Sequence, residues 1–171
     1  MASNNTMGLA YYYARDYDRA IEYYKIALEI APDNEAYNSN IAFAYISNEQ
    51  YKDAAEAYQK WFRLRKITNA DEIFRECFAS GKYNKPSLQK YLRNILEESD
   101  KTNNPFTPLN KAYFYAYMDE IDSAFVMLEK AFEEKDTELA LSMSNPVFDN
   151  LRSDPRFQEL LKKMNLDKYF K

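Results

Sequence analysis

Histidine is absent from the 171 residues, and cysteine occurs once, at Cys77. Histidine is the commonest general base and metal ligand, so Ser-His-Asp and Cys-His arrangements are excluded. A single cysteine also excludes an internal disulfide, and without histidine it excludes zinc sites of the usual Cys/His type. Cys77 lies in a helical pattern with Ile73, Phe74 and Phe78, which predicts a buried small side chain. The composition therefore predicts a non-enzyme without metal or cofactor.

Glycine is nearly absent, with two residues in the chain. We therefore expect no glycine-rich phosphate loop and few tight turns, in a chain built from helices. No apolar run approaches the ~20 residues of a membrane span, and the first six residues lack a secretory signal. A cytoplasmic location is favoured unless a leader has been removed. The helical pattern begins almost at residue 1, which suggests a domain of a longer protein or a replaced leader.

Charge is unevenly distributed, although the net charge is only −4 and the pI is about 5.1. Residues 60–93 hold nine positive and three negative residues, a local charge of +6, so the remainder carries −10. Such a segment could bind an acidic protein or a nucleic-acid backbone. The favoured interpretation is that Arg63, Arg65 and Lys66 complement a helix C-terminus and pair with acidic neighbours. The acidic pI disfavours nucleic acid as the main partner.

Tyrosine is abundant, with 16 residues in the chain, and several of them recur at a fixed spacing. Adding 34 to four positions of the first copy gives the same residue in the second: Tyr11 and Tyr45, Tyr17 and Tyr51, Ala20 and Ala54, Tyr24 and Tyr58. Gly8 becomes Ala42, another small residue. A fixed period in this range predicts a stacked array of repeats. Gly8 and Ala20 let two helix axes approach closely, and Pro32 ends the second helix.

This pattern resembles the tetratricopeptide repeat family. The matching small, aromatic and proline positions are Gly8, Tyr11, Tyr17, Ala20, Tyr24, Ala27 and Pro32. The first copy has Asn4 in place of the family's tryptophan, and the second has Trp61 where a small residue is expected. The resemblance implies an all-α fold: a right-handed superhelical array of antiparallel helix hairpins, a tetratricopeptide-like α-solenoid, with a C-terminal capping helix.

We expect one domain over residues 1–171. Its parts are repeats at 1–34 and 35–68, a degenerate hairpin at 69–104, a repeat at 105–138 and a cap at 139–171. The first four helices are predicted at about 4–14, 17–31, 35–48 and 51–66. The fourth lacks a proline terminator, so we expect it to run further than the second. The segment 125–164 resembles the closing region of bacterial tetratricopeptide proteins.

The resemblance implies a non-catalytic scaffold whose concave groove, lined by the first helix of each repeat, binds a peptide or helix of a partner protein. The groove positions carried over are Asn5, Leu9, Tyr12, Tyr13, Asn40, Phe43, Ile46, Asn110, Tyr113 and Tyr117. Aromatic rings supply contact area and amides hold a peptide backbone. The competing interpretation is that the superhelix or the C-terminal tail buries some of these rings.

Two other functions stay open. One is a regulatory or sensor domain of a larger bacterial transcription factor, cyclase or kinase. The other is self-association into a homo-oligomer through the tyrosine-rich N-terminal helix, which has no capping repeat. A clamp for the C-terminal carboxylate of a chaperone is disfavoured, because only Asn40 stands at a required position. We expect a protein or peptide partner, neither nucleic acid nor a membrane.

Overall fold

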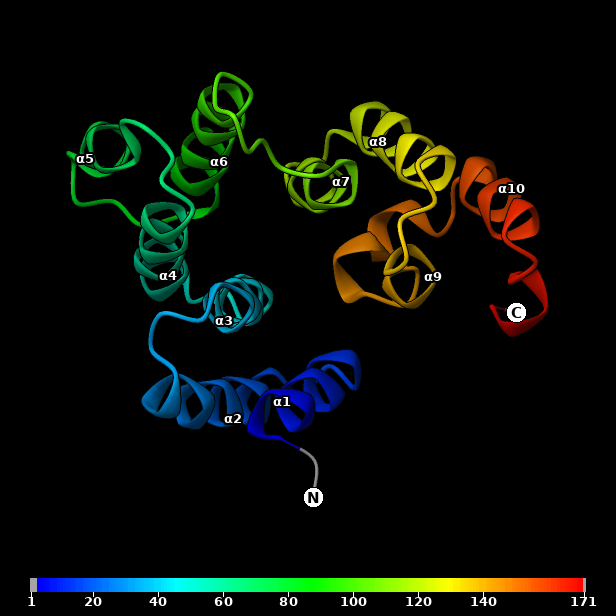
Figure 1. The fold of residues 1–171 in the computed structure, drawn as a ribbon, viewed down its shortest axis with the longest axis horizontal. Coiled ribbons are helices and arrows are strands. Elements are labelled where there is room, and N and C mark those ends of the chain that lie inside the picture. Colours follow the sequence, from blue (N-terminus) through cyan, green and yellow to red (C-terminus); the bar gives the residue numbers. More distant parts are fainter. Residues whose placement is uncertain (1–2, 171) are drawn as a thin grey trace. The chain divides into compact units, whose positions relative to one another are not determined.

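The computed structural model describes residues 3–170, and every regular element in that range is a helix. The prediction of an all-α fold is therefore confirmed. The chain divides into two compact units, one ending at Pro105 and the other beginning at Phe106 (Figure 1). None of the helices in the described range is both long and apolar enough to span a bilayer.

Unit 1 consists of three consecutive helix pairs. They are α1 (Asn4–Tyr13) with α2 (Tyr17–Ile30), α3 (Glu35–Ser47) with α4 (Tyr51–Leu64), and α5 (Ala70–Phe78) with α6 (Lys85–Ser99). Each helix packs on the next one along the chain, and α1 also contacts α3 while α4 contacts α6. Polar side chains accept backbone N–H bonds at four of the helix starts: Ser3, Asp16, Asn34 and Asn84. Local sequence therefore fixes where these helices begin.

Unit 2 contains one regular helix pair and a less regular closing segment. The pair is α7 (Pro108–Tyr117) and α8 (Ile121–Glu133); the closing segment is α9 (Leu139–Ser142), the 3-10 helix η1 (Pro146–Leu151), α10 (Pro155–Lys163) and the 3-10 helix η2 (Asp167–Tyr169). η1 packs on α7, and α10 packs on α8. The side chain of Asp154 caps α10. Pro155 is the first residue of this helix, a position that suits proline because its N–H would have no partner within the helix.

The core lies where the small residues of the repeat pattern meet large ones. Ala20, Ala54 and Ala124 are fully buried. The Tyr24 ring lies directly against Gly8, and a Cβ at Gly8 would come within 2.5 Å of Cε1 of Tyr24. Burial raises the pKa of the Tyr24 hydroxyl well above its usual value, so this group is neutral. The small residues thus act as close-approach positions between paired helices.

Helix α4 is no longer than α2, the second helix of the first pair, since both have 14 residues. The prediction that the fourth helix runs further than the second is therefore wrong. Lys66 adopts a left-handed conformation with φ of 57°. The N–H of Ile67 then bonds to the carbonyl of Phe62 at 3.1 Å, and the Ile67 side chain is buried. This backbone reversal ends the helix without proline.

The corners of three hairpins share one backbone geometry. Arg15, Glu49 and Asp119 all have positive φ, at 62°, 56° and 61°. In each case the next residue donates its N–H to the carbonyl five positions earlier at 2.9 Å. Glycine is the usual residue at such a left-handed helix end. The expectation that few glycines mean few tight turns is therefore wrong, because other residues adopt this conformation.

Side-chain ties join neighbouring hairpins, and each closes about one repeat of chain. The pairs are 34 or 35 positions apart: Tyr12 with Ser47 in unit 1, and Asp122 with Arg156, Glu129 with Lys163 and Asn150 with the Ala116 carbonyl in unit 2. The three contacts in unit 2 join the closing segment to the α7–α8 pair. Their partners are 34 positions apart in sequence, which is the length of one repeat.

Candidate functional site

Helices α1 and α3 bring two predicted amides together. Asn5 and Asn40 are both half-buried, and Nδ2 of Asn40 donates a hydrogen bond to Oδ1 of Asn5 at 3.0 Å. An asparagine amide has two N–H donors and an oxygen with two lone pairs. This single bond therefore leaves donors on Asn5 and acceptor capacity on Asn40, which is the hydrogen-bonding character that a peptide backbone needs.

Three further predicted residues of unit 1, Leu9, Tyr13 and Phe43, are half-buried. Leu9 and Phe43 pack against the core shared by α1, α2 and α3. The Phe43 ring meets the Tyr58 ring edge-on, with centroids 5.8 Å apart. Each of the three side chains thus combines a packed side with some accessible surface.

Tyr12 and Ile46, also predicted for the groove, are buried, with 3% and 6% of their surface exposed. The Tyr12 hydroxyl lies 3.4 Å from Oγ of Ser47. Tyr12 thus joins α1 to α3, and both Tyr12 and Ile46 present little surface to a partner. Their burial fits the competing interpretation that the array itself covers part of the predicted set.

The predicted residues of unit 2, Asn110, Tyr113 and Tyr117, lie on α7 and are half-buried. The Tyr113 ring stacks on Phe148 of η1 with centroids 5.1 Å apart. Its hydroxyl donates to Oγ of Ser142 at 2.6 Å. The closing segment of the chain therefore engages Tyr113, as an additional repeat would.

One residue beside the predicted set was missed from the sequence. Trp61, on α4, is buried with its ring centroid 6.5 Å from that of Phe43 and 6.0 Å from that of Tyr58. The predicted groove is lined by the first helix of each repeat only, and Trp61 lies on a second helix. The signal was the unusual tryptophan at a position where the repeat expects a small side chain.

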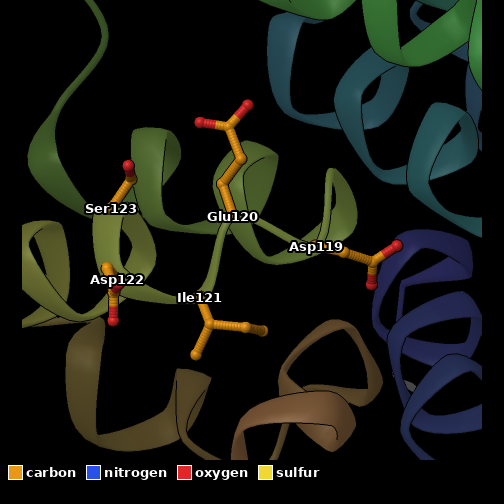
Figure 2. A pocket seen from close by; sticks show the side chains of 5 residues that line it. All are labelled: Asp119, Glu120, Ile121, Asp122 and Ser123. Carbon is orange, nitrogen blue, oxygen red and sulfur yellow. The ribbon is translucent and has the colours of Figure 1, made fainter.

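The turn between α7 and α8 forms an open hollow of about 450 Å³ lined by residues 119–123. Figure 2 shows the carboxylates of Asp119, Glu120 and Asp122 pointing in different directions. Asp122 pairs with Arg156 at 2.7 Å, and Asp119 accepts a hydrogen bond from Asn150 at 3.2 Å. Across residues 3–170 there is no group of three or more acidic, cysteine or histidine side chains that could hold a metal ion.

Comparison with known proteins agrees with this architecture in one part of the chain. Residues 4–34, which contain α1 and α2, match the family model of the tetratricopeptide repeat. No curated protein matches the chain. Such repeats typically serve as protein-binding modules and are usually non-catalytic. Residues 4–34 are therefore a tetratricopeptide repeat, at the start of an all-α chain of consecutive helix pairs.

Proposed function

We propose that unit 1 is a non-catalytic scaffold that binds an extended peptide or a helix of a partner protein on the face formed by α1 and α3. The observation that carries the proposal is the amide pair Asn5–Asn40, which joins the two helices at 3.0 Å. An amide pair can hold a peptide backbone whatever the sequence of the peptide, because it bonds to main-chain groups.

The surrounding side chains support the same function. Leu9, Tyr13 and Phe43 offer partly accessible apolar surface next to the amides. Aromatic residues anchored by packing lose little conformational freedom when a partner binds. Tyr12 joins the two helices through its contact with Ser47 of α3. The two other functions, a regulatory domain of a larger protein and self-association into a homo-oligomer, stay predictions from the sequence.

The test begins with co-purification from the native host and identification of the bound protein by mass spectrometry. The double variant Tyr13→Ala/Asn40→Ala is then titrated with the identified fragment. Removing a hot-spot ring and a hydrogen-bonding amide should weaken binding by about tenfold or more. The control variant is Tyr169→Ala, whose side chain is 71% exposed and lies outside this face.

Stability is followed separately by the fluorescence of Trp61, the one tryptophan of the chain. We expect the double variant to keep a cooperative unfolding transition while it loses affinity. Recovery of the same partners with unchanged affinity would show that the face formed by α1 and α3 is not the binding site.

A further inference from the structure

Two isoleucines lie exposed on the second helix of the first pair. Ile26 and Ile30, both on α2, have 36% and 75% of their surface exposed. They are four residues apart, so they lie next to each other on one side of the helix. Among the described residues of unit 1, no other large apolar side chain is this exposed. The two isoleucines therefore form a local apolar surface and are not scattered single residues.

Other hairpins of the chain carry different residues at these two positions. Ile26 lies six residues after the buried Ala20, and Ile30 lies ten residues after it. Counted in the same way from Ala54 and Ala124, the equivalents of Ile26 are Lys60 and Lys130, and those of Ile30 are Leu64 and Glu134. Leu64 is half-buried and Glu134 is exposed. Among these three hairpins, an exposed pair of isoleucines is peculiar to the first, so the packing of a hairpin does not require it.

The second helix pair shows what kind of element covers the corresponding side of a hairpin. Ile41 and Ala44 of α3 are 4% and 0% exposed, and they share a core cluster with Ile21 of α2. The residues 34 positions earlier on α1, Met7 and Ala10, are half-buried and exposed. A helix thus covers this side of the second pair, and the same side of the first pair has room for a helix.

Two stacked tyrosines extend the apolar surface from α2 to α1. The Tyr23 ring of α2 stacks on the Tyr11 ring of α1, with centroids 5.4 Å apart and planes 18° apart. Both residues are half-buried. Tyr23 lies three residues before Ile26, which places it on the same side of α2. We call the surface made by these four residues the outer face of the first pair: Tyr11, Tyr23, Ile26 and Ile30.

The charges beside this outer face are complementary to themselves. Glu22 and Lys25 are exposed, and neither forms an ion pair with a described residue. Nζ of Lys25 lies 5.9 Å from the ring centroid of Tyr45 on α3. When two α2 helices lie antiparallel across a two-fold axis between residues 23 and 24, Glu22 of each copy faces Lys25 of the other. A two-fold axis therefore joins unlike charges twice.

We propose that the chain forms a two-fold symmetric homodimer through the outer face of the first pair. A second copy supplies both features that this face requires, a helix with exposed isoleucines and charges of the opposite sign. The interface gives a surface to the self-association that the sequence predicts, and places it mainly on α2. The proposal goes beyond the binding of a partner peptide on the face formed by α1 and α3, and does not depend on it.

The experiment measures dimerisation of the whole chain by sedimentation equilibrium. The variant Ile26→Lys/Ile30→Glu introduces the residue types of Lys130 and Glu134, which occupy the equivalent positions in a folded hairpin, and leaves the net charge unchanged. It should raise the dissociation constant of the dimer by about tenfold or more. The control Val126→Lys/Leu141→Glu makes the same changes at side chains that are 61% and 68% exposed in unit 2. It should dimerise normally, and equal weakening in both variants would overturn the proposal.

A charge exchange tests the two-fold arrangement. Glu22→Lys and Lys25→Glu should each raise the dissociation constant by about threefold or more, because like charges then face each other twice in the dimer. The double variant Glu22→Lys/Lys25→Glu restores unlike pairs and should dimerise like the unmodified chain. A double variant no tighter than the single ones would overturn the proposal. Urea unfolding followed by Trp61 fluorescence should give a cooperative transition for all three variants, since both residues are exposed.

Two further measurements separate this interface from other occupants and from the other face. A chain that stays monomeric up to about 1 mM would overturn the proposal, because the outer face would then need an occupant other than a second copy. The variant Tyr13→Ala/Asn40→Ala should dimerise normally. A loss of dimer in that variant would place the interface on the face formed by α1 and α3 and overturn its assignment to α2.

Discussion

The variant Gly8→Ala tests the packing on which the repeat depends. Considered alone, α1 should gain stability, because alanine is favoured over glycine inside a helix by about 1 kcal/mol. In the folded protein the added Cβ would lie 2.5 Å from Cε1 and 2.6 Å from Cδ1 of Tyr24. Real Cβ atoms do not approach carbon so closely, so the Tyr24 ring or the helix must shift.

The ring has little room to move, because Tyr24 is 1% exposed. Overpacking a well-packed site costs about 1–3 kcal/mol, which exceeds the gain in helix propensity in most of that range. We expect a net destabilisation of about 1 kcal/mol, or a few degrees in melting temperature. Urea unfolding followed by Trp61 fluorescence reports on unit 1, since this residue is buried there.

The chain supplies a matched control one repeat further on. Ala42 occupies the equivalent position and is fully buried, so Ala42→Gly should also destabilise, by about 1 kcal/mol from helix propensity alone. A double-mutant cycle completes the test: in a Tyr24→Leu background, Gly8→Ala should become neutral or stabilising. If Gly8→Ala stabilised the wild-type protein, the close approach of α1 and α2 would be refuted.

Two pairs of variants test hydroxyl burial and the hairpin corners by urea unfolding. The Tyr91 hydroxyl is buried with no hydrogen-bond partner among the described residues, so Tyr91→Phe should stabilise by about 1 kcal/mol. Tyr113→Phe should destabilise by a similar amount, because it removes the bond to Ser142; the same sign for both variants would contradict this reasoning. Glu49→Gly should stabilise by about 1 kcal/mol, because glycine adopts a φ of 56° without the steric cost of a Cβ. Glu49→Ala keeps the Cβ and should not stabilise. Equal effects of the two variants would show that this corner carries no backbone strain.

The fold could be read from the sequence where small and large residues recur at fixed spacing. The positions of Ala20 and Ala54, both fully buried, placed the first two hairpins. The helix corners could not be read in this way. Glycine is the usual signal for a left-handed residue, and Glu49 supplies that conformation without it.

The candidate site was predicted less completely than the fold. The repeat register placed Asn5 and Asn40 on first helices, but their hydrogen bond depends on the exact spacing between α1 and α3. The repeat register also predicted both Tyr12 and Tyr13 as groove residues, but in the structure Tyr12 is buried and Tyr13 is half-buried. The contact of Tyr113 with Phe148 depends on the course of an irregular closing segment. Side-chain burial and long-range contacts of this kind have no counterpart in a local pattern.

The ties between neighbouring hairpins bear on how the molecule forms and fails. Each joins residues only 34 or 35 positions apart, so the chain search needed to make any of them is short. A mechanical force applied between the two ends of the chain would break these contacts one after another, so that the hairpins unfold in turn. The protein would then lengthen in steps of about one repeat, as a quasi-one-dimensional spring does.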